Sequence, residues 1–224
     1  MKIIAEKTYS TLFGVEYITI STWCKDRLWN KYNKSSRYAP NGINFYNYTS
    51  YKRNLNKNKI RLLIEGDSKS YYNYVDESFK IVNMLDKNKF EIWYLSYNGI
   101  PKYWYKVDNF LYKVPYEKVK DIYLQCDILL KSSWLQSFSY PPLEMMATGG
   151  FCIVVANGGN REYLKNNVNC LFYELGNYKD AINCIQRLIL DKSLQQTLYI
   201  NGLNTAKSRD WGNFKKEIIA LYYK

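Results

Sequence analysis

KSSWLQSFSYPPLEMMATGGFCIVVANGGNRE, residues 131–162, is the stretch of this sequence that decides its fold. Two prolines at 141–142 open a helix, because proline is tolerated in a first helical turn, and they place Glu144 just inside it. Free backbone N–H groups at such a helix start attract anions. Glycines at 149–150 end the helix, and an apolar strand at 151–155 follows. This succession predicts βα units of a parallel sheet.

The same alternation of short apolar runs and helical periods extends outward from residue 60. Strands are expected at 61–64, 90–95, 110–112, 128–130, 151–155 and 170–172, and helices at 75–85, 117–125, 143–148, 178–190, 193–208 and 214–222. The predicted fold class is α/β, a Rossmann-like doubly wound parallel sheet. Such sheets bind ligands at the carboxyl ends of their strands.

The beginning of the chain has a different organisation. A strand at 17–20, a helix at 22–32 capped by Ser21 and a turn at 38–43 make one βα unit, which is too little for a domain. Residues 45–59 are polar and are interpreted as a linker. The predicted divisions are therefore 1–44, the linker 45–59, a domain at 60–208 and a terminal helix within 209–224.

Composition excludes several classes of function. The 224 residues include no histidine, which removes serine–histidine and cysteine–histidine catalysis. Five scattered cysteines favour neither a zinc site nor a disulfide framework. Residues 1–10 lack a signal peptide and no long apolar run follows, so a cytoplasmic protein is expected, at most peripheral at the inner face of a membrane. A net charge of +12 suits nucleic acid, an acidic membrane or a nucleotide diphosphate, but the basic residues are dispersed.

The segment 131–162 resembles the donor-site signature of the retaining group 1 glycosyltransferases, two-domain enzymes of the GT-B fold. In that signature Glu144 matches the second of two acids, and the turn residues Gly158 and Gly159 match the glycine pair. Ala147, Gly149, Asn160 and Glu162 match the remainder, and residues 40–43 match the usual inter-domain junction. The resemblance covers nearly the whole chain. Residues 66–68 and 131–133 look closest to the rhamnosyltransferase-like branch of surface polysaccharide assembly.

The resemblance implies that a sugar moves from a nucleotide diphosphate sugar to a glycan or lipid-linked acceptor, with retention and without a metal or other cofactor. It also implies that residues 1–44 are only a remnant of an N-terminal acceptor-binding domain, to which the helix in 209–224 would cross back. Apolar surface left exposed there would favour self-association. The chain could be truncated, the product of a split gene, or a relict that binds a donor without transferring its sugar.

Two positions depart from the family pattern. The first acid of the pair falls on Gln136, a neutral amide that can bind sugar hydroxyls but cannot stabilise a developing positive charge. The first strand ends in residues 65–69, EGDSK, where the family supplies an arginine and a lysine for the pyrophosphate. Lys69 or Lys131 is then the substitute.

The candidate residues follow from these matches. Gln136, Glu144 and Lys131 are the candidate catalytic residues: Glu144 would accept hydrogen bonds from the ribose, and Lys131 would neutralise the leaving diphosphate. Donor binding is expected from Gly66, Ser68, Lys69, Tyr112, Lys113, Ser137, Phe138, Glu144, Gly158, Gly159 and Asn160. Glu162 is expected to be a structural brace, although Gly158 and Gly159 could form an ordinary turn and Lys131 could be solvated.

Two other classes of protein remain as alternatives. A nucleic-acid-binding module would need a clustered basic groove with stacking aromatics, and none is evident. A dinucleotide-binding oxidoreductase would need a glycine-rich fingerprint after the first strand, where Gly66 is the single glycine. The tyrosines Tyr71, Tyr72 and Tyr74 are expected to be half-buried packing residues.

Overall fold

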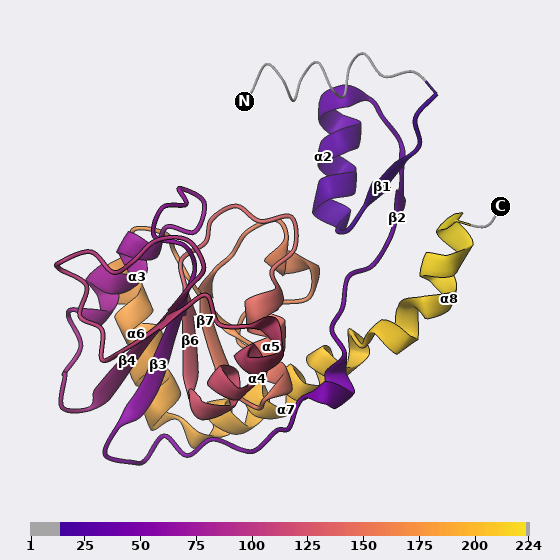
Figure 1. Ribbon diagram of the computed structural model, residues 1–224. Helices are drawn as coiled ribbons and strands as arrows, with labels where there is room; N and C mark the ends of the chain where they lie inside the picture. Colours follow the sequence, from indigo (N-terminus) through magenta and orange to yellow (C-terminus); the bar gives the residue numbers. More distant parts are fainter. Residues whose placement is uncertain (1–13, 223–224) are drawn as a thin grey trace.

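The computed structural model describes residues 14–222 and is shown in Figure 1. The segment 1–10, on which the expectation of no signal peptide rests, lies outside the described residues. Within residues 14–222 no helix combines the length and apolarity that a membrane crossing requires.

The main body is built on a six-stranded sheet in which all neighbouring strands are parallel. Its strands are β3 (Ile60–Glu65), β4 (Phe90–Ser96), β5 (Asn109–Tyr112), β6 (Ile128–Lys131), β7 (Phe151–Val155) and β8 (Leu171–Tyr173), in the spatial order β5-β4-β3-β6-β7-β8. The chain thus moves outward from β3, returns to β6 and moves outward again. The predicted doubly wound sheet is confirmed, and its order reverses between β3 and β6, the place where such sheets bind ligands.

Helices cover both faces of the sheet (Figure 1). They are α3 (Val75–Val82) and α6 (Tyr178–Leu190) on one face, and α4 (Tyr116–Gln125) and α5 (Tyr140–Ala147) on the other. Helix α7 (Lys192–Ser208) contributes to both cores, with Leu194 and Leu198 on the α6 side and Ala206 on the α5 side. Alternation along β3 explains the two layers, since Leu62 and Ile64 join the core under α3 and α6 whereas Leu63 joins the core under α4 and α5. Apart from the edge strand β5, the strands are mostly buried on both faces, which is why they form nearly continuous apolar runs in the sequence.

The N-terminal unit consists of β1 (Tyr17–Thr19), α2 (Thr22–Tyr32) and β2 (Ser36–Tyr38), with β1 and β2 paired in parallel. Ser21 caps α2 as expected, its hydroxyl accepting a hydrogen bond from the backbone N–H of Cys24 at 3.2 Å. Part of the expected turn at 38–43 is instead the end of β2. In Figure 1 this unit stands apart from the main sheet and is joined to it by the segment that follows β2.

Residues 45–59, predicted to be a linker, are packed against the main body. After the short 3-10 helix Phe45–Asn47, the chain runs along the base of the domain (Figure 1). Arg53 is only 2% exposed, and its guanidinium donates to the carbonyl oxygens of Cys126 at 2.9 Å and Tyr123 at 3.0 Å. Leu55 is fully buried in the core. Residues 45–59, called the strap from here on, therefore connect the two units as a segment that is fixed on the main body.

The terminal helix α8 (Trp211–Tyr222) starts three residues earlier than the expected helix at 214–222. It meets the junction at 40–43 through two backbone hydrogen bonds of 2.9 Å, from Ile43 N–H to the carbonyl of Arg209 and from Trp211 N–H to the carbonyl of Ile43. A Cβ at Gly42 would lie 2.1 Å from the carbonyl oxygen of Arg209, so the close approach needs glycine. From this contact α8 leads away from the main body, toward the side on which the N-terminal unit stands (Figure 1).

Candidate functional site

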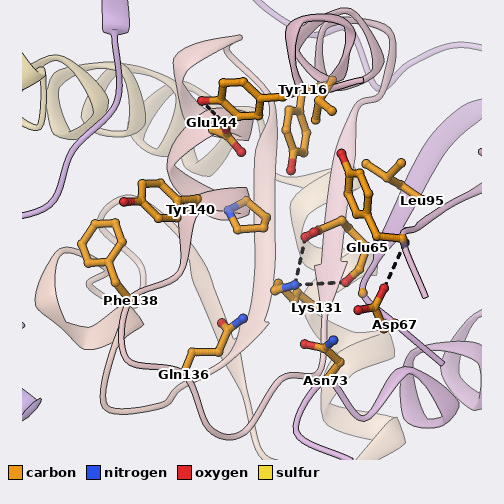
Figure 2. Close-up of a pocket in the computed structure, with 15 residues that line it drawn as sticks. Glu65, Asp67, Asn73, Leu95, Tyr116, Lys131, Gln136, Phe138, Tyr140 and Glu144 are labelled. Atoms are coloured by element: carbon orange, nitrogen blue, oxygen red, sulfur yellow. Dashed lines mark hydrogen bonds and ion pairs between the residues drawn. The ribbon is translucent and has the colours of Figure 1, made fainter. Parts of the chain in front are cut away.

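A cavity of about 440 Å³ opens at the carboxyl ends of β3 and β6, where the strand order reverses. It is lined by Glu65, Gly66, Asp67, Asn73, Leu95, Tyr97, Tyr116, Val119, Tyr123, Lys131, Gln136, Phe138, Tyr140, Pro141 and Glu144. Figure 2 shows Glu144, Tyr116 and Tyr140 toward one end of this cavity, Lys131 and Glu65 in the middle, and Gln136 and Asn73 toward the other end. The sheet topology thus brings the three candidate catalytic residues to one cavity.

Glu144 is a buried carboxyl group, 5% exposed, in the middle of α5. The hydroxyl of Tyr48 donates to its Oε1 at 2.8 Å, and the hydroxyl of Tyr116 lies 3.5 Å from the same oxygen. Burial raises the pKa of Glu144 from 4.5 to about 7; the hydrogen bond from Tyr48 opposes this rise, and the negative charge of Glu65 adds to it. Near neutral pH this carboxyl therefore exchanges between its acidic and its basic form.

The start of α5 offers fewer anion-binding donors than the sequence pattern suggested. The helix begins at Tyr140, earlier than the expected 143, so that Pro141 and Pro142 occupy its first turn. Proline has no N–H group, and the backbone of these two residues cannot donate to a ligand. A diphosphate in this cavity would depend on side chains more than on the helix end.

Lys131, at the end of β6, is 4% exposed and is held by β3. Its ammonium group lies 2.9 Å from Oε2 of Glu65 and donates to the backbone carbonyl of Glu65 at 3.0 Å. The lysine is therefore ion-paired and not solvated, and the carboxylate of Glu65 neutralises much of its charge. Glu65 was not among the predicted site residues; its only signal was its position as the last residue of an apolar strand beside β6.

Gln136 lines the cavity with its Oε1 atom buried and without a hydrogen-bond partner in the described structure. Figure 2 shows the side chain across the cavity from Lys131. An unsatisfied buried acceptor of this kind costs about 1–3 kcal/mol. A ligand hydroxyl donated to Gln136 would remove that cost.

Of the other predicted binding residues, Gly66 and Phe138 line the cavity. Ser68 donates its hydroxyl to the backbone carbonyl of Ile100 at 3.1 Å, so it braces the loop between β3 and α3. The remaining predicted residues on strand ends and loops, namely Lys69, Tyr112, Lys113 and Ser137, are exposed and are not part of the cavity lining. Tyr112 ends the edge strand β5 and Lys113 follows it; β4, whose Leu95 lines the cavity, lies between β5 and β3.

The glycine turn after β7 packs against protein. A Cβ at Gly158 would lie 2.3 Å from the indole of Trp23 in α2, and one at Gly159 would lie 2.4 Å from the carbonyl oxygen of Gln136. The amide side chain of Asn160 donates to the carbonyl of Val155 at 2.8 Å and accepts from the N–H of Asn157. This turn therefore packs against the backbone of the loop that carries Gln136 and supports its position.

Glu162 holds the N-terminal unit on the main body. Its carboxylate accepts hydrogen bonds from the N–H of Thr22 at 2.9 Å, from the hydroxyl of Thr22 at 2.6 Å and from the hydroxyl of Tyr38 at 2.5 Å. The guanidinium of Arg209 lies 3.7 Å away. The predicted role of Glu162 as a structural brace is confirmed.

Besides Glu65, sequence reasoning missed Asp67, which lines the cavity, and Tyr48, which contacts Glu144 from outside the lining. Asp67 accepts hydrogen bonds from the backbone N–H groups of Tyr97 at 2.9 Å and Asn98 at 2.7 Å, and so fixes the loop after β4. Tyr48, which reaches Glu144 from the strap, had no signal in a stretch rich in tyrosine. Among residues 14–222, no three His, Cys, Asp or Glu side chains gather closely enough to hold a metal ion.

Comparison with known proteins fits this geometry. The family model described as "Glycosyl transferases group 1" matches residues 106–205, which include α5 and the loops on either side of it. No curated protein sequence matches the chain.

Solved structures match over nearly the entire chain. Sucrose-phosphate synthase from Thermosynechococcus elongatus superimposes with a TM-score of 0.80 at 16% identity, covering 99% of this chain and 60% of that one. HepE of Anabaena, solved in complex with UDP and glucose, gives 0.80 at 15% identity, covering 98% and 66%. WaaG, a glycosyltransferase involved in lipopolysaccharide biosynthesis, gives 0.77 at 13%, covering 97% and 65%.

The fold is thus that of the C-terminal domain of GT-B glycosyltransferases, with a short N-terminal unit attached. Residues 106–205 are similar to the glycosyl transferases group 1 model, and the chain spans about 60% of the length of the first of these structures. At such low identities the structural likeness establishes the fold alone.

Proposed function

We propose that this chain is the nucleotide-sugar-binding half of a retaining glycosyltransferase, which transfers a sugar from a nucleoside diphosphate to a glycan or lipid-linked acceptor in surface polysaccharide or related glycan synthesis. The single observation that carries the proposal is the placement of Glu144: a buried acid, facing the cavity at the reversal point of the sheet, inside the segment that matches the group 1 family model. The complex of Anabaena HepE with UDP and glucose supports a nucleotide sugar as the ligand.

In this proposal the ribose, the diphosphate and the sugar of the donor lie in that order along the cavity. Glu144 accepts hydrogen bonds from the ribose hydroxyls, since an ionised carboxylate has acceptor sites and no donor. Lys131 lies between Glu144 and Gln136, where the diphosphate would bridge nucleoside and sugar (Figure 2). Gln136 accepts a hydrogen bond from the donor sugar. A positive charge near the diphosphate stabilises it as the sugar leaves.

The alternative is a fragment that binds a nucleotide sugar without transferring its sugar. Two observations favour it: Gln136 stands where the family has an acid, and Lys131 is already neutralised by Glu65 at 2.9 Å. An acceptor-binding domain beside this one would complete the cleft in either case. A nucleic-acid-binding role has no comparable support, because the cavity holds three carboxylates (Glu65, Asp67 and Glu144) and one paired lysine.

Ligand binding tests the proposal. A panel of nucleoside diphosphates and their sugar esters is titrated by calorimetry into the 224-residue chain and into Glu144→Ala. Glu117→Ala is the matched control, because Glu117 is an exposed acid in the first turn of α4. Saturable binding of one nucleotide, weakened at least about tenfold by Glu144→Ala and unchanged by Glu117→Ala, is the expected result. Binding that Glu144→Ala leaves unchanged would refute the assignment, and release of the sugar from the bound nucleotide sugar would separate the enzyme from the binding fragment.

A further inference from the structure

Three aromatic side chains gather at the protein surface beside the cavity. Tyr71 is 71% exposed, which corrects the expectation that it is a half-buried packing residue, whereas Tyr72 is 45% exposed. The ring of Trp134 lies 5.5 Å from that of Tyr71 and 5.8 Å from that of Tyr72, and the two tyrosine rings lie 5.9 Å apart. Tyr71, Tyr72 and Trp134 are called the aromatic platform below.

The platform is held in place by the backbone. The indole N–H of Trp134 donates to the carbonyl of Tyr71 at 3.2 Å, and the backbone N–H of Trp134 donates to the carbonyl of Tyr72 at 3.3 Å. Tyr74, two residues after Tyr72, has a φ of 49°. A bulky residue keeps this left-handed backbone conformation only where its surroundings enforce it. The indole N–H is already used, so the platform offers mainly ring surface to a ligand.

The platform adjoins the end of the cavity opposite Glu144. Asn73 follows Tyr72, and Gln136 follows Trp134 by two residues, and both line the cavity. Figure 2 shows Asn73 and Gln136 together, on the side of Lys131 away from Glu144. A ligand whose nucleoside lies at Glu144 and whose sugar lies at Gln136 therefore points its reactive end toward the platform.

We propose that the aromatic platform binds the acceptor, by stacking on the apolar face of a pyranose ring of a glycan. The assignment rests on the proposed function, because that function places the donor sugar at Gln136. Aromatic rings bury large area and engage a partner through their faces and edges, which suits a sugar ring that is apolar on one side. The continuity with the cavity favours a glycan chain over a membrane, because a chain can enter the space next to Gln136 and a bilayer surface cannot.

Saturation-transfer NMR tests the platform without requiring turnover. Methyl glycosides of glucose, galactose, mannose and rhamnose, and the trisaccharides maltotriose, cellotriose and chitotriose, are the probes. The variant Tyr71→Ala removes the most exposed ring but keeps the backbone carbonyl that Trp134 uses, so the fold is retained. Tyr71→Phe keeps the ring, and Tyr46→Ala removes another exposed tyrosine, 77% exposed and located in the strap.

The expected result is binding of at least one probe that Tyr71→Ala weakens about fivefold and that Tyr71→Phe and Tyr46→Ala leave unchanged. Binding of no probe, or binding that Tyr71→Ala does not alter, overturns the proposal. Sedimentation with phosphatidylglycerol vesicles that is lost in Tyr71→Ala, in the absence of sugar binding, would instead identify a membrane contact and overturn it as well.

The nucleotide titration on the same variants separates this proposal from the proposed function. Tyr71→Ala is expected to bind nucleotide as the unaltered chain does, since Tyr71 does not line the cavity. Sugar binding at the platform without any nucleotide binding would leave a glycan-binding surface and remove the donor site. Nucleotide binding without sugar binding would leave the donor site and remove the glycan-binding surface.

Discussion

The titration of Glu144 gives a measurable pH dependence of stability. Its pKa is raised from 4.5 to about 7 in the folded protein, chiefly by burial. At about 1.4 kcal/mol for each pH unit, the full rise corresponds to about 3 kcal/mol. Because the folded state binds this proton more tightly than the unfolded state, the stabilisation is complete below pH 4.5 and is lost as the pH rises to about 7.

The variant Glu144→Gln isolates this contribution. Glutamine keeps an acceptor for Tyr48 but cannot ionise, so the variant is expected to gain about 2–3 kcal/mol relative to the unaltered chain between about pH 5 and pH 8. The chain has no histidine, and the background titration in this window is therefore small. Urea unfolding at several pH values in this range measures the difference in free energy of unfolding.

The control is Glu117→Gln, which removes an exposed acid from α4 and should leave the pH profile unchanged. A difference between Glu144→Gln and the unaltered chain that stays constant from pH 5 to pH 8 would refute the reasoning. It would mean that Glu144 titrates in the folded protein much as it does in the unfolded chain. The cavity would then be wet enough to solvate the carboxylate.

Three further predictions concern the neighbours of this carboxyl group. Tyr48→Phe removes a hydrogen bond that favours the ionised form, so the pKa of Glu144 should rise and the pH-dependent loss of stability should move to higher pH in the same unfolding series. Glu65→Gln leaves the buried ammonium of Lys131 without its ion pair; it should lower the stability of the free protein and, by calorimetry, tighten nucleoside diphosphate binding on the order of tenfold. Gly159→Ala introduces a methyl group 2.4 Å from a backbone oxygen of the loop 136–138, and it should cost about 1–3 kcal/mol of stability in urea unfolding and weaken nucleotide-sugar binding.

The sheet was predictable because its signal is local. Apart from the edge strand β5, the strands of the parallel sheet are largely apolar on both faces, so each run stands out between polar turns. The helix ends were less accurate where two signals competed: the prolines at 141–142 mark the first turn of α5, which places its start at Tyr140 and not at 143. Helix α3 ends at Val82 and not at 85, in residues that continue as a turn with the same apolar spacing.

The strap shows what local signals cannot supply. Residues 45–59 look like a linker because they are polar, yet Arg53 is among the most buried residues of the chain. Its guanidinium binds the backbone carbonyls of Tyr123, near the end of α4, and of Cys126, which follows the helix. Every residue has a backbone carbonyl, whatever its side chain. No spacing in the sequence therefore points to them. Tyr48 was missed for the same reason, since its partner Glu144 lies 96 positions away.

The charge of the cavity depends on strand order more than on composition. Glu65 and Lys131 end strands that are neighbours in the sheet but are separated by two other strands in the chain, so their pairing appears only once the order β4-β3-β6 is known. Glu65 also raises the pKa of Glu144. A diphosphate that draws Lys131 away from Glu65 would increase the negative charge felt by Glu144 and favour its protonated form. Ligand binding and protonation of this site are therefore linked through Glu65, and the affinity for a nucleotide sugar should depend on pH even though the chain contains no histidine.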